Sequence, residues 1–291
     1  MRITGHHMMA THAKNVAAAQ EDVARLADQI SSGRAVRRAS DDPVAWAQAR
    51  RDELRATLSR GRGDGLALAN DQLAETERAL TTIGNAVAEG RALAIQAAND
   101  SYGPIQRAML ATHVNGLFEL ALSAANTQDA SGAYLLAGSL SATAPFDATG
   151  AYVGDASVRD VETSEGARGA ASLAGTSLTA ASGIDVLPAL RALATALAAN
   201  DRPNISLAIA ALTDGNEQVS AARAEIGAMA SVVREADLGR GALEDRLAAR
   251  ISDMVDVDVV AAATELAQGS HVLEAAQLVG AKLTALLSPR R

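Results

Sequence analysis

Apolar residues recur at alternating steps of three and four residues at both ends of this chain, and this pattern constrains the fold more than any other feature. The N-terminal series is Met9, His12, Val16, Ala19, Val23, Leu26 and Ile30. The C-terminal series is Val259, Ala262, Leu266, Gly269, Leu273, Ala276, Gly280, Leu283 and Leu287. Such steps place the side chains on one face of an α-helix, as in a coiled coil. We therefore expect a helix at each end, and each needs a partner for its apolar face.

Seven-residue repeats also run through the middle of the chain. One series is Leu66, Leu73, Leu80, Val87 and Ala94. A second series is Leu212, Val219, Ile226, Val233, Leu247 and Met254, in which Arg240 is the only misfit. We interpret both as core positions of long neighbouring helices. The glycine-rich segment 61–65 interrupts the first of these helices, and we expect a local bend there.

A helix start follows the N-terminal series. Ser31, Ser32 and Gly33 form a cluster that ends a helix, and the next helix is expected to open at Ser40, Asp41, Asp42 and Pro43. Proline suits the first helical position because its missing N–H would be unpaired there in any case. Asp42 can cap the helix, and both carboxylates favour its positive end. We interpret these four residues as a joint between domains, with Trp46 as a nearby packing anchor.

The composition favours side-by-side helices over a thick core. Aromatic residues make up 2 % of the chain, and 68 of the 291 residues are alanine. Alanine lets helices approach closely but buries little area. Residues 138–183 differ, because they are rich in Gly, Ser and Thr and lack a helical period; Tyr152, Val153, Val158 and Val161 suggest short strands there. The expected fold is mainly α: an elongated antiparallel helical bundle or coiled coil with a small β-rich insertion.

Several kinds of chemistry are disfavoured. The absence of cysteine excludes disulfides, thiolate metal sites and cysteine nucleophiles. His6, His7 and His12 cannot share one helical face as a metal site would require. No phosphate loop or nucleophile motif occurs in its structural context. We expect no enzyme, no metal and no cofactor. A net charge of −8 disfavours a nucleic-acid partner, and the short apolar runs predict no membrane insertion.

The two terminal series match each other if the helices pair antiparallel. With the chain ends side by side, facing residues have numbers that add up to about 292. Basic residues would then lie opposite acidic ones at the inner end of the pair: Arg34, Arg37 and Arg38 against Asp253, Asp256 and Asp258. Exposed ion pairs would set the register more than the stability. The alternative is that both groups are solvated faces. Because so thin a pair buries little area, we expect both ends to be disordered in the monomer and to fold on assembly.

Two terminal motifs resemble those of a known family. The run Gln29-Ile30-Ser31-Ser32-Gly33-Arg34, followed by Ala39 to Pro43, resembles the N-terminal signature of the flagellin superfamily. Asp256-Val257-Asp258, followed by Leu266, Leu273, Glu274-Ala275-Ala276 and Lys282-Leu283, is similar to its C-terminal signature. The stretch 134–139, with Pro145-Phe146 and Tyr152 to Asp155, resembles the junction-protein group of that superfamily, hook-associated protein 3. The tail after Leu286 lacks the aromatic residue usual in the family.

The resemblance implies a structural protein of the bacterial flagellum, extracellular after export by the flagellar type III apparatus with an export chaperone. It implies a homo-oligomeric ring at the hook–filament junction, between hook-associated protein 1 and flagellin. Residues 1–32 and 257–291 would form the terminal coiled coil, residues 33–137 and 184–256 a rod-like α domain, and residues 138–183 the outer β domain. The assembly residues of the terminal helices would be Val16, Val23, Leu26, Ile30, Leu266, Leu273, Leu283 and Leu287. Flagellin itself and an unrelated coiled-coil scaffold remain as alternatives.

Overall fold

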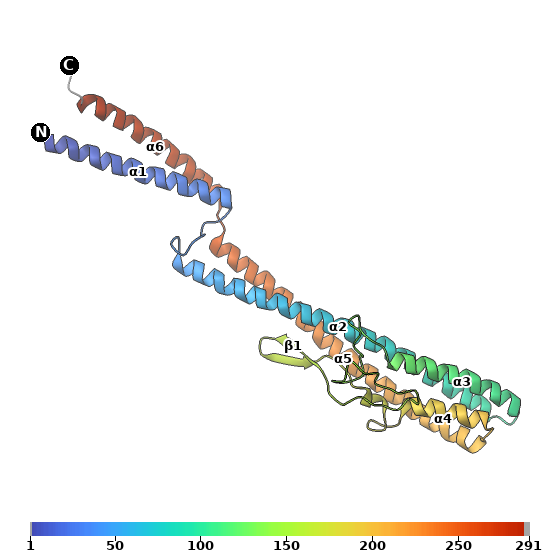
Figure 1. The fold of residues 1–291 in the computed structure, drawn as a ribbon. Helices are drawn as coiled ribbons and strands as arrows, with labels where there is room; N and C mark the ends of the chain where they lie inside the picture. Colours follow the sequence, from blue (N-terminus) through green and yellow to red (C-terminus); the bar gives the residue numbers. More distant parts are fainter. Residues whose placement is uncertain (1, 288–291) are drawn as a thin grey trace. The chain divides into compact units, whose positions relative to one another are not determined.

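The structure is a computed structural model that describes the backbone of residues 2–287 and the side chains of residues 7–285. Six α-helices, a two-stranded sheet and a 3₁₀ turn make up this described part (Figure 1). Their bounds, in chain order, are α1 Arg2–Ser32, α2 Pro43–Ala98, α3 Pro104–Ala125, β1 Asp160–Ser164, β2 Ala167–Ala170, η1 Gly175–Leu178, α4 Val186–Ala198, α5 Arg202–Val255 and α6 Val259–Leu287. The predicted mainly α fold is confirmed. None of the helices within residues 2–287 is both long and apolar enough to cross a membrane.

The chain divides into two compact units. The terminal unit comprises Met1–Leu58 and Leu243–Arg291, and the central unit comprises Ser59–Ala242. In the terminal unit α1 packs against α6. In the central unit α3 packs against α4, and both contribute to a core shared with α2 and α5.

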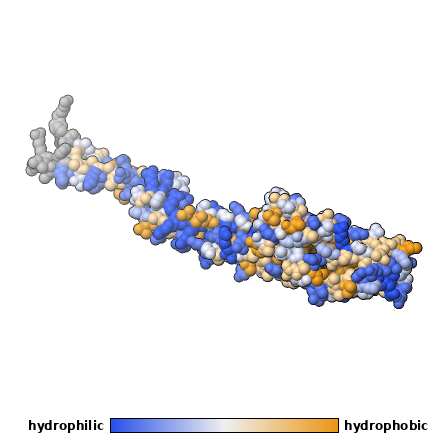
Figure 2. Space-filling model, turned by 60° about the horizontal axis from the view of Figure 1, so that its bottom comes forward, coloured by the Kyte–Doolittle hydropathy of each residue, from blue (hydrophilic) through white to orange (hydrophobic). Residues whose placement is uncertain are grey.

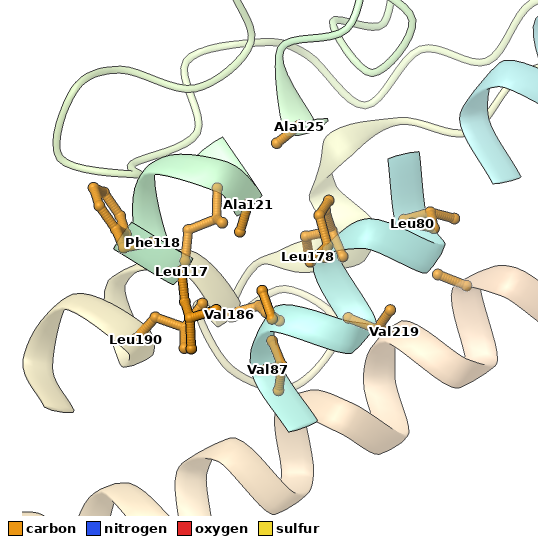
Figure 3. Close-up of a cluster of buried hydrophobic side chains, with 14 of the residues drawn as sticks. Leu80, Val87, Leu117, Phe118, Ala121, Ala125, Leu178, Val186, Leu190 and Val219 are labelled. Carbon is orange, nitrogen blue, oxygen red and sulfur yellow. The ribbon is translucent and has the colours of Figure 1, made fainter. Parts of the chain in front are cut away.

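The core of the central unit contains the predicted heptad positions. Leu73, Leu80 and Val87 of α2 are at most 1 % exposed, as are Leu212, Val219 and Val233 of α5. Figure 3 shows core side chains from four helices in one cluster, among them Val87 of α2, Leu117 of α3, Leu190 of α4 and Val219 of α5. Gly84 allows close approach of α2 to α5, because a Cβ there would lie 3.3 Å from Val219. The seven-residue repeats therefore mark core positions, as predicted.

The predicted interruption at residues 61–65 is wrong, because α2 is continuous from Pro43 to Ala98. The glycines have a packing role instead. A Cβ on Gly63 would lie 2.9 Å from Cζ and Nε of Arg240, the misfit of the α5 repeat. The missing side chain on α2 thus makes room for a long one on α5. Glycine in a helix costs about 1 kcal/mol relative to alanine, and the packing of the rest of α2 is sufficient to keep the helix continuous through this segment.

The insertion contains less strand than its composition suggested. Asp160 to Ser164 pairs antiparallel with Ala167 to Ala170, which places the predicted Val161 in a strand. Tyr152 forms only an isolated bridge with Phe146, and Val153 and Val158 lie outside the strands. Aspartate side chains organise the remaining loops instead: Asp147 Oδ1 accepts hydrogen bonds from the backbone N–H groups of Thr149 (2.7 Å) and Ala151 (3.0 Å). Such side-chain bonds compete with strand ladders for the backbone.

Asn126 follows the last residue of α3, Ala125, at the start of the segment that leads into this insertion. Its side-chain nitrogen donates to the carbonyl of Phe146 (2.9 Å), and its side-chain oxygen accepts from the Phe146 N–H (3.0 Å). These two bonds fasten the insertion to the end of the helix.

Candidate assembly surface

The seam between α1 and α6 contains the predicted apolar series. Leu26 and Ala262 are 6 % and 5 % exposed, and the other seam positions on both helices are half-buried, with Val259 as the exposed exception. The predicted assembly residues on this seam are Val16, Val23, Leu26, Ile30, Leu266, Leu273 and Leu283. Leu287 ends α6, and its side chain lies outside the described residues. Within one chain, these residues are therefore used to hold α1 against α6.

Two glycines of α6 fix the register of this pair. A Cβ on Gly269 would lie 3.3 Å from Val23, and one on Gly280 would lie 2.5 Å from Nε2 of His12. Both contacts follow the antiparallel register expected from the sequence. The glycines allow α1 to approach closely and leave space for the bulkier His12 on the opposing helix.

Backbone hydrogen bonds join the two connecting segments at the inner end of this pair. The N–H of Val257 donates to the carbonyl of Gly33 (3.0 Å), and the N–H of Ala35 donates to the carbonyl of Val255 (2.8 Å). Arg34 and Asp256 lie opposite each other in a single antiparallel bridge. Gly33 has a φ of 71°, which glycine adopts without strain. The chain therefore enters and leaves the terminal helix pair through one hydrogen-bonded crossing.

The segments that carry the predicted basic and acidic groups lie side by side at this crossing, but the contacts between them are backbone hydrogen bonds. Within the described residues, no ion pair joins Arg34, Arg37 or Arg38 to Asp253, Asp256 or Asp258. Arg37 pairs instead with Asp28 on α1. The Asp256 carboxylate accepts from Ser252 Oγ (2.6 Å). The Asp258 carboxylate caps α6 by accepting from the N–H groups of Val260 and Ala261 (both 3.0 Å).

The motif of residues 40–43 uses two aspartates in different ways: Asp42 caps helix α2, and Asp41 binds the loop before it. The Asp42 carboxylate accepts from the N–H groups of Val44 and Ala45 (both 2.9 Å) and so caps α2, whose first residue is Pro43. The Asp41 carboxylate accepts from the N–H groups of Arg37 (3.0 Å) and Arg38 (2.9 Å). These backbone bonds lower the pKa of Asp41 below its usual range. Ser40 Oγ also contacts Asp41. The motif therefore holds the loop between α1 and α2 in one conformation.

An ion pair between a buried aspartate and an exposed arginine lies nearby in the terminal unit and was not predicted. Asp52 of α2 is 2 % exposed, and its Oδ2 lies 3.0 Å from Nη2 of Arg250 on α5. The contact lacks the angle of a hydrogen bond, so the attraction is that of two charges. The only sequence signal is an aspartate one turn after Ala49 on the buried side of the helix. Its burial depends on the position of α5, which the sequence pattern does not reveal.

Large apolar side chains are also exposed on α6 away from the seam, among polar ones such as His271 and Glu274. Val260, Val272, Leu278 and Val279 are 79 %, 61 %, 66 % and 51 % exposed. A helix with apolar residues on both its seam and its outer face is suited to contact more than one neighbour. Residues 7–285 contain no group of three or more side chains that could hold a metal ion.

Comparison with known proteins agrees with this architecture. Residues 4–141 match the family model described as the bacterial flagellin N-terminal helical region. Flagellar hook-associated protein 3 of Escherichia coli K12 is 30 % identical over 163 residues, which cover 54 % of this chain and 50 % of that protein. The corresponding protein of Salmonella typhimurium LT2 is 30 % identical over 159 residues. The chain thus aligns with about half the length of these curated relatives.

A solved structure assigned to a flagellar hook-associated protein of Vibrio parahaemolyticus matches with a TM-score of 0.68 at 22 % identity, covering 74 % of this chain and all of the other. The flagellar junction protein FlgL of Legionella pneumophila matches with a TM-score of 0.58 at 16 % identity, covering 72 % of this chain and all of the other. At these identities the matches establish the fold. Residues 4–141 therefore resemble the bacterial flagellin N-terminal helical region, and the chain is similar in sequence to flagellar hook-associated protein 3 and in fold to solved structures of that group.

Proposed function

We propose that this protein is a structural adaptor at the junction between hook and filament of the bacterial flagellum. In this role it connects hook-associated protein 1 on one side to flagellin on the other, as one copy in a ring of like subunits. It acts as a mechanical joint and not as an enzyme. The observation that carries the proposal is the pairing of α1 with α6 in register, with large apolar side chains left exposed on α6 away from the seam.

The pairing suits an assembly component. The seam consists largely of small and medium side chains, so the pair alone gains little from the hydrophobic effect. We propose that residues 1–32 and 257–291 form the inner coiled coil only when neighbouring copies cover the outer face of α6. In the free monomer these segments would be disordered, as helices with too little buried area commonly are.

The remaining domains follow from this arrangement. Residues 33–137 and 184–256 would form a rod-like helical domain, and residues 138–183 a small domain on its outer side. The protein would reach the cell exterior through the flagellar type III export apparatus, held by an export chaperone until then. Low stability of the terminal helices favours this route, because an exported chain must pass unfolded.

Deletion of the gene tests the proposal. Cells lacking the protein are expected to build hooks, to synthesise and export flagellin, and to form no filament. Electron microscopy would show bare hooks, and an immunoblot would show flagellin in the medium. Filament formation should return when the full chain is expressed from a plasmid.

Flagellin is the alternative, since the matching family model describes the flagellin N-terminal region. If this chain were the only flagellin, its deletion would remove the filament subunit itself, and purified filaments would consist of this protein. Labelling with an antibody separates the two roles. The adaptor role predicts a label confined to the hook end, whereas a label along the whole filament would contradict it.

A further inference from the structure

The central unit has an apolar ridge on the outer side of α3. Its members, called the α3 ridge, are Ile105, Met109 and Leu120, which are 77 %, 70 % and 52 % exposed. They lie on one helical stripe, and the core residues Val114 and Ala121 lie on the opposite side of the helix. Ile105 and Met109 are one turn apart, and Leu120 lies three turns further along the stripe, after the exposed Thr112 and Gly116. Figure 2 shows apolar areas of this kind among polar ones on one face of the molecule.

A groove of about 440 Å³ lies between α4 and α5 of the same unit. Six of the ten residues that line it are alanine: Ala189, Ala192, Ala196, Ala199, Ala208 and Ala211. Because these side chains are short, the two helix backbones form the walls of the groove, which is open to larger side chains from outside. Leu207 lines the groove as well and is 67 % exposed. We call this feature the α4–α5 groove.

The ridge and the groove point away from each other. Leu117 and Phe118 on the inner side of α3 lie beside Leu190 of α4 (Figure 3). Ala199 follows Leu190 by nine residues, which at about 100° per residue is half a turn around the helix. The groove therefore opens on the side of α4 that is turned away from α3, while the ridge faces outward from α3.

The two features also lie at the same height along the unit. Nη1 of Arg107 donates to Oδ1 of Asn200 (2.6 Å), and the guanidinium of Arg191 lies 5.4 Å from the centre of the Phe118 ring. These contacts align the antiparallel helices α3 and α4. They place Met109 level with Ala199, and Leu120 level with Ala189.

We propose that the α3 ridge of one copy docks in the α4–α5 groove of a second copy that stands beside it in the same orientation and at the same height. Such a contact joins two different surfaces, so each copy uses its ridge on one side and its groove on the other. Contacts of this type close into a ring when the rotation between neighbouring copies divides a full turn, and otherwise they form an open helix. The proposal rests on the ring proposed above and names its lateral contact.

The charge at the end of the groove and the area of the α3 ridge are both compatible with a second copy of the chain as the partner. Asp201 lies at the end of the groove that is level with the first turn of α3, a turn that contains no acidic residue. Its carboxylate accepts from the Asn204 N–H (3.2 Å) and so caps α5 of its own chain, and its charge also faces that end of the groove. A carboxylate near the positive end of a neighbouring helix is favourable. The ridge covers roughly 22 Å by 10 Å, or about 220 Å², whereas a stable free dimer requires about 800 Å² per partner. The contact is therefore too small for an isolated dimer and suits one of several contacts within an assembly.

Cysteine cross-linking tests the contact, because the chain has no cysteine of its own. Full-length single variants would be mixed in pairs, at high concentration and also within isolated hook–filament assemblies, and then oxidised. The matched pairs are Met109→Cys with Ala199→Cys, and Leu120→Cys with Ala189→Cys. The mismatched pairs exchange the partners, so that the same four cysteines are tested at the wrong height. We expect at least fivefold more reducible mixed dimer from the matched pairs than from the mismatched ones.

Equal yields from matched and mismatched pairs in both preparations would overturn the proposal. A dominant Met109→Cys homodimer would overturn it too, because two ridges would then face each other. A second variant gives an independent measurement: Met109→Glu should reduce filament formation at least tenfold, while Asn115→Glu, exposed on another side of α3, should not. If the unmodified chain fails to restore filaments but the matched cross-links form, the proposed function is wrong and the contact stands. If the unmodified chain restores filaments but the matched cross-links do not form, the proposed contact is wrong and the proposed function stands.

Discussion

Gly63 of α2 lies directly against the guanidinium of Arg240 on α5, so that the glycine-rich stretch of one helix accommodates the single misfit in the repeat of the other. Arg240 also pairs with Asp237 one turn earlier (2.8 Å), and its side chain is 22 % exposed. A residue without a side chain and a residue with a long one thus occupy a position where two medium apolar residues would normally meet. The glycine-rich stretch on α2 and the arginine in the α5 repeat are therefore explained by a single contact between the two helices.

Substitution of Gly63 should reveal this arrangement. Alanine in a helix is worth about 1 kcal/mol over glycine. Gly61→Ala should gain most of that, because a Cβ there meets nothing within 4 Å. Gly63→Ala should gain less than half as much, because Arg240 must move. Urea unfolding of the full chain measures the difference. In an Arg240→Ala background the two gains should become equal, and a persistent difference would contradict the packing explanation.

The pair of Asp52 and Arg250 should be sensitive to loss of one partner only. Arg250→Met leaves the carboxylate of Asp52 buried without its counter-charge. We expect a cost of about 2 kcal/mol in unfolding free energy, reduced from larger values for fully buried pairs because Arg250 is half exposed. The double variant Asp52→Leu/Arg250→Met should recover most of it. If the double variant is as unstable as Arg250→Met, the pair contributes nothing through charge.

Leu26 offers a test of the terminal seam. Leu26→Ala truncates the one leucine of α1, a residue that is 6 % exposed, and should weaken the α1–α6 pair by about 2 kcal/mol. If the ends fold only on assembly, this variant should form fewer filaments while the unfolding of the dilute monomer stays unchanged. Met8→Ala, at a residue that is 57 % exposed, is the matched control. Strong amide-exchange protection of residues 7–30 in the dilute monomer would instead show that the pair is already folded.

Charge reversal tests the pairing predicted between the basic and acidic groups at the crossing. Arg37→Glu/Arg38→Glu should reduce filament assembly if these arginines contact Asp256 or Asp258 in the assembled state. Reversal of Asp256 and Asp258 to lysine in the same chain should then restore it. Because Asp258 caps α6, Asp258→Asn serves as a control that keeps a capping group without the charge. Lack of rescue would leave the arginines with their observed partners, Asp28 and Asp41.

The loop that follows α3 should lose stability in acid. Hydrogen bonds from Ser131, and further ones from Ala133 and Gln72, lower the pKa of Asp129 to about 2. An aspartate with a pKa below its unfolded value of about 3.9 stabilises the fold above that pH. This contribution is lost as the pH falls through the folded pKa. The melting temperature should therefore drop between about pH 4 and pH 2, and Asp129→Asn should flatten that drop. An unchanged pH profile in the variant would show that Asp129 does not contribute.

Local patterns in the sequence were sufficient for most elements of the fold. The three-four steps predict α1 and α6, the cap at Asp42 predicts the start of α2, and the antiparallel register predicts that Gly269 faces Val23. Each rests on helical periodicity or on hydrogen bonds to neighbouring N–H groups. These features can be predicted because they depend on residues close in sequence, or on two apolar series that share the same spacing and can be aligned with each other.

Only the tertiary structure determined which distant positions meet. The burial of Asp52, the fit of Gly63 to Arg240 and the common height of the α3 ridge and the α4–α5 groove all depend on how helices far apart in the chain are placed. Periodicity tells which side of a helix is covered but not by which neighbour. By itself the sequence determined the helices, their caps and their apolar faces. Packing decided which helices contact each other, because the space beside a glycine on one helix can be filled only by a side chain of the helix that lies opposite.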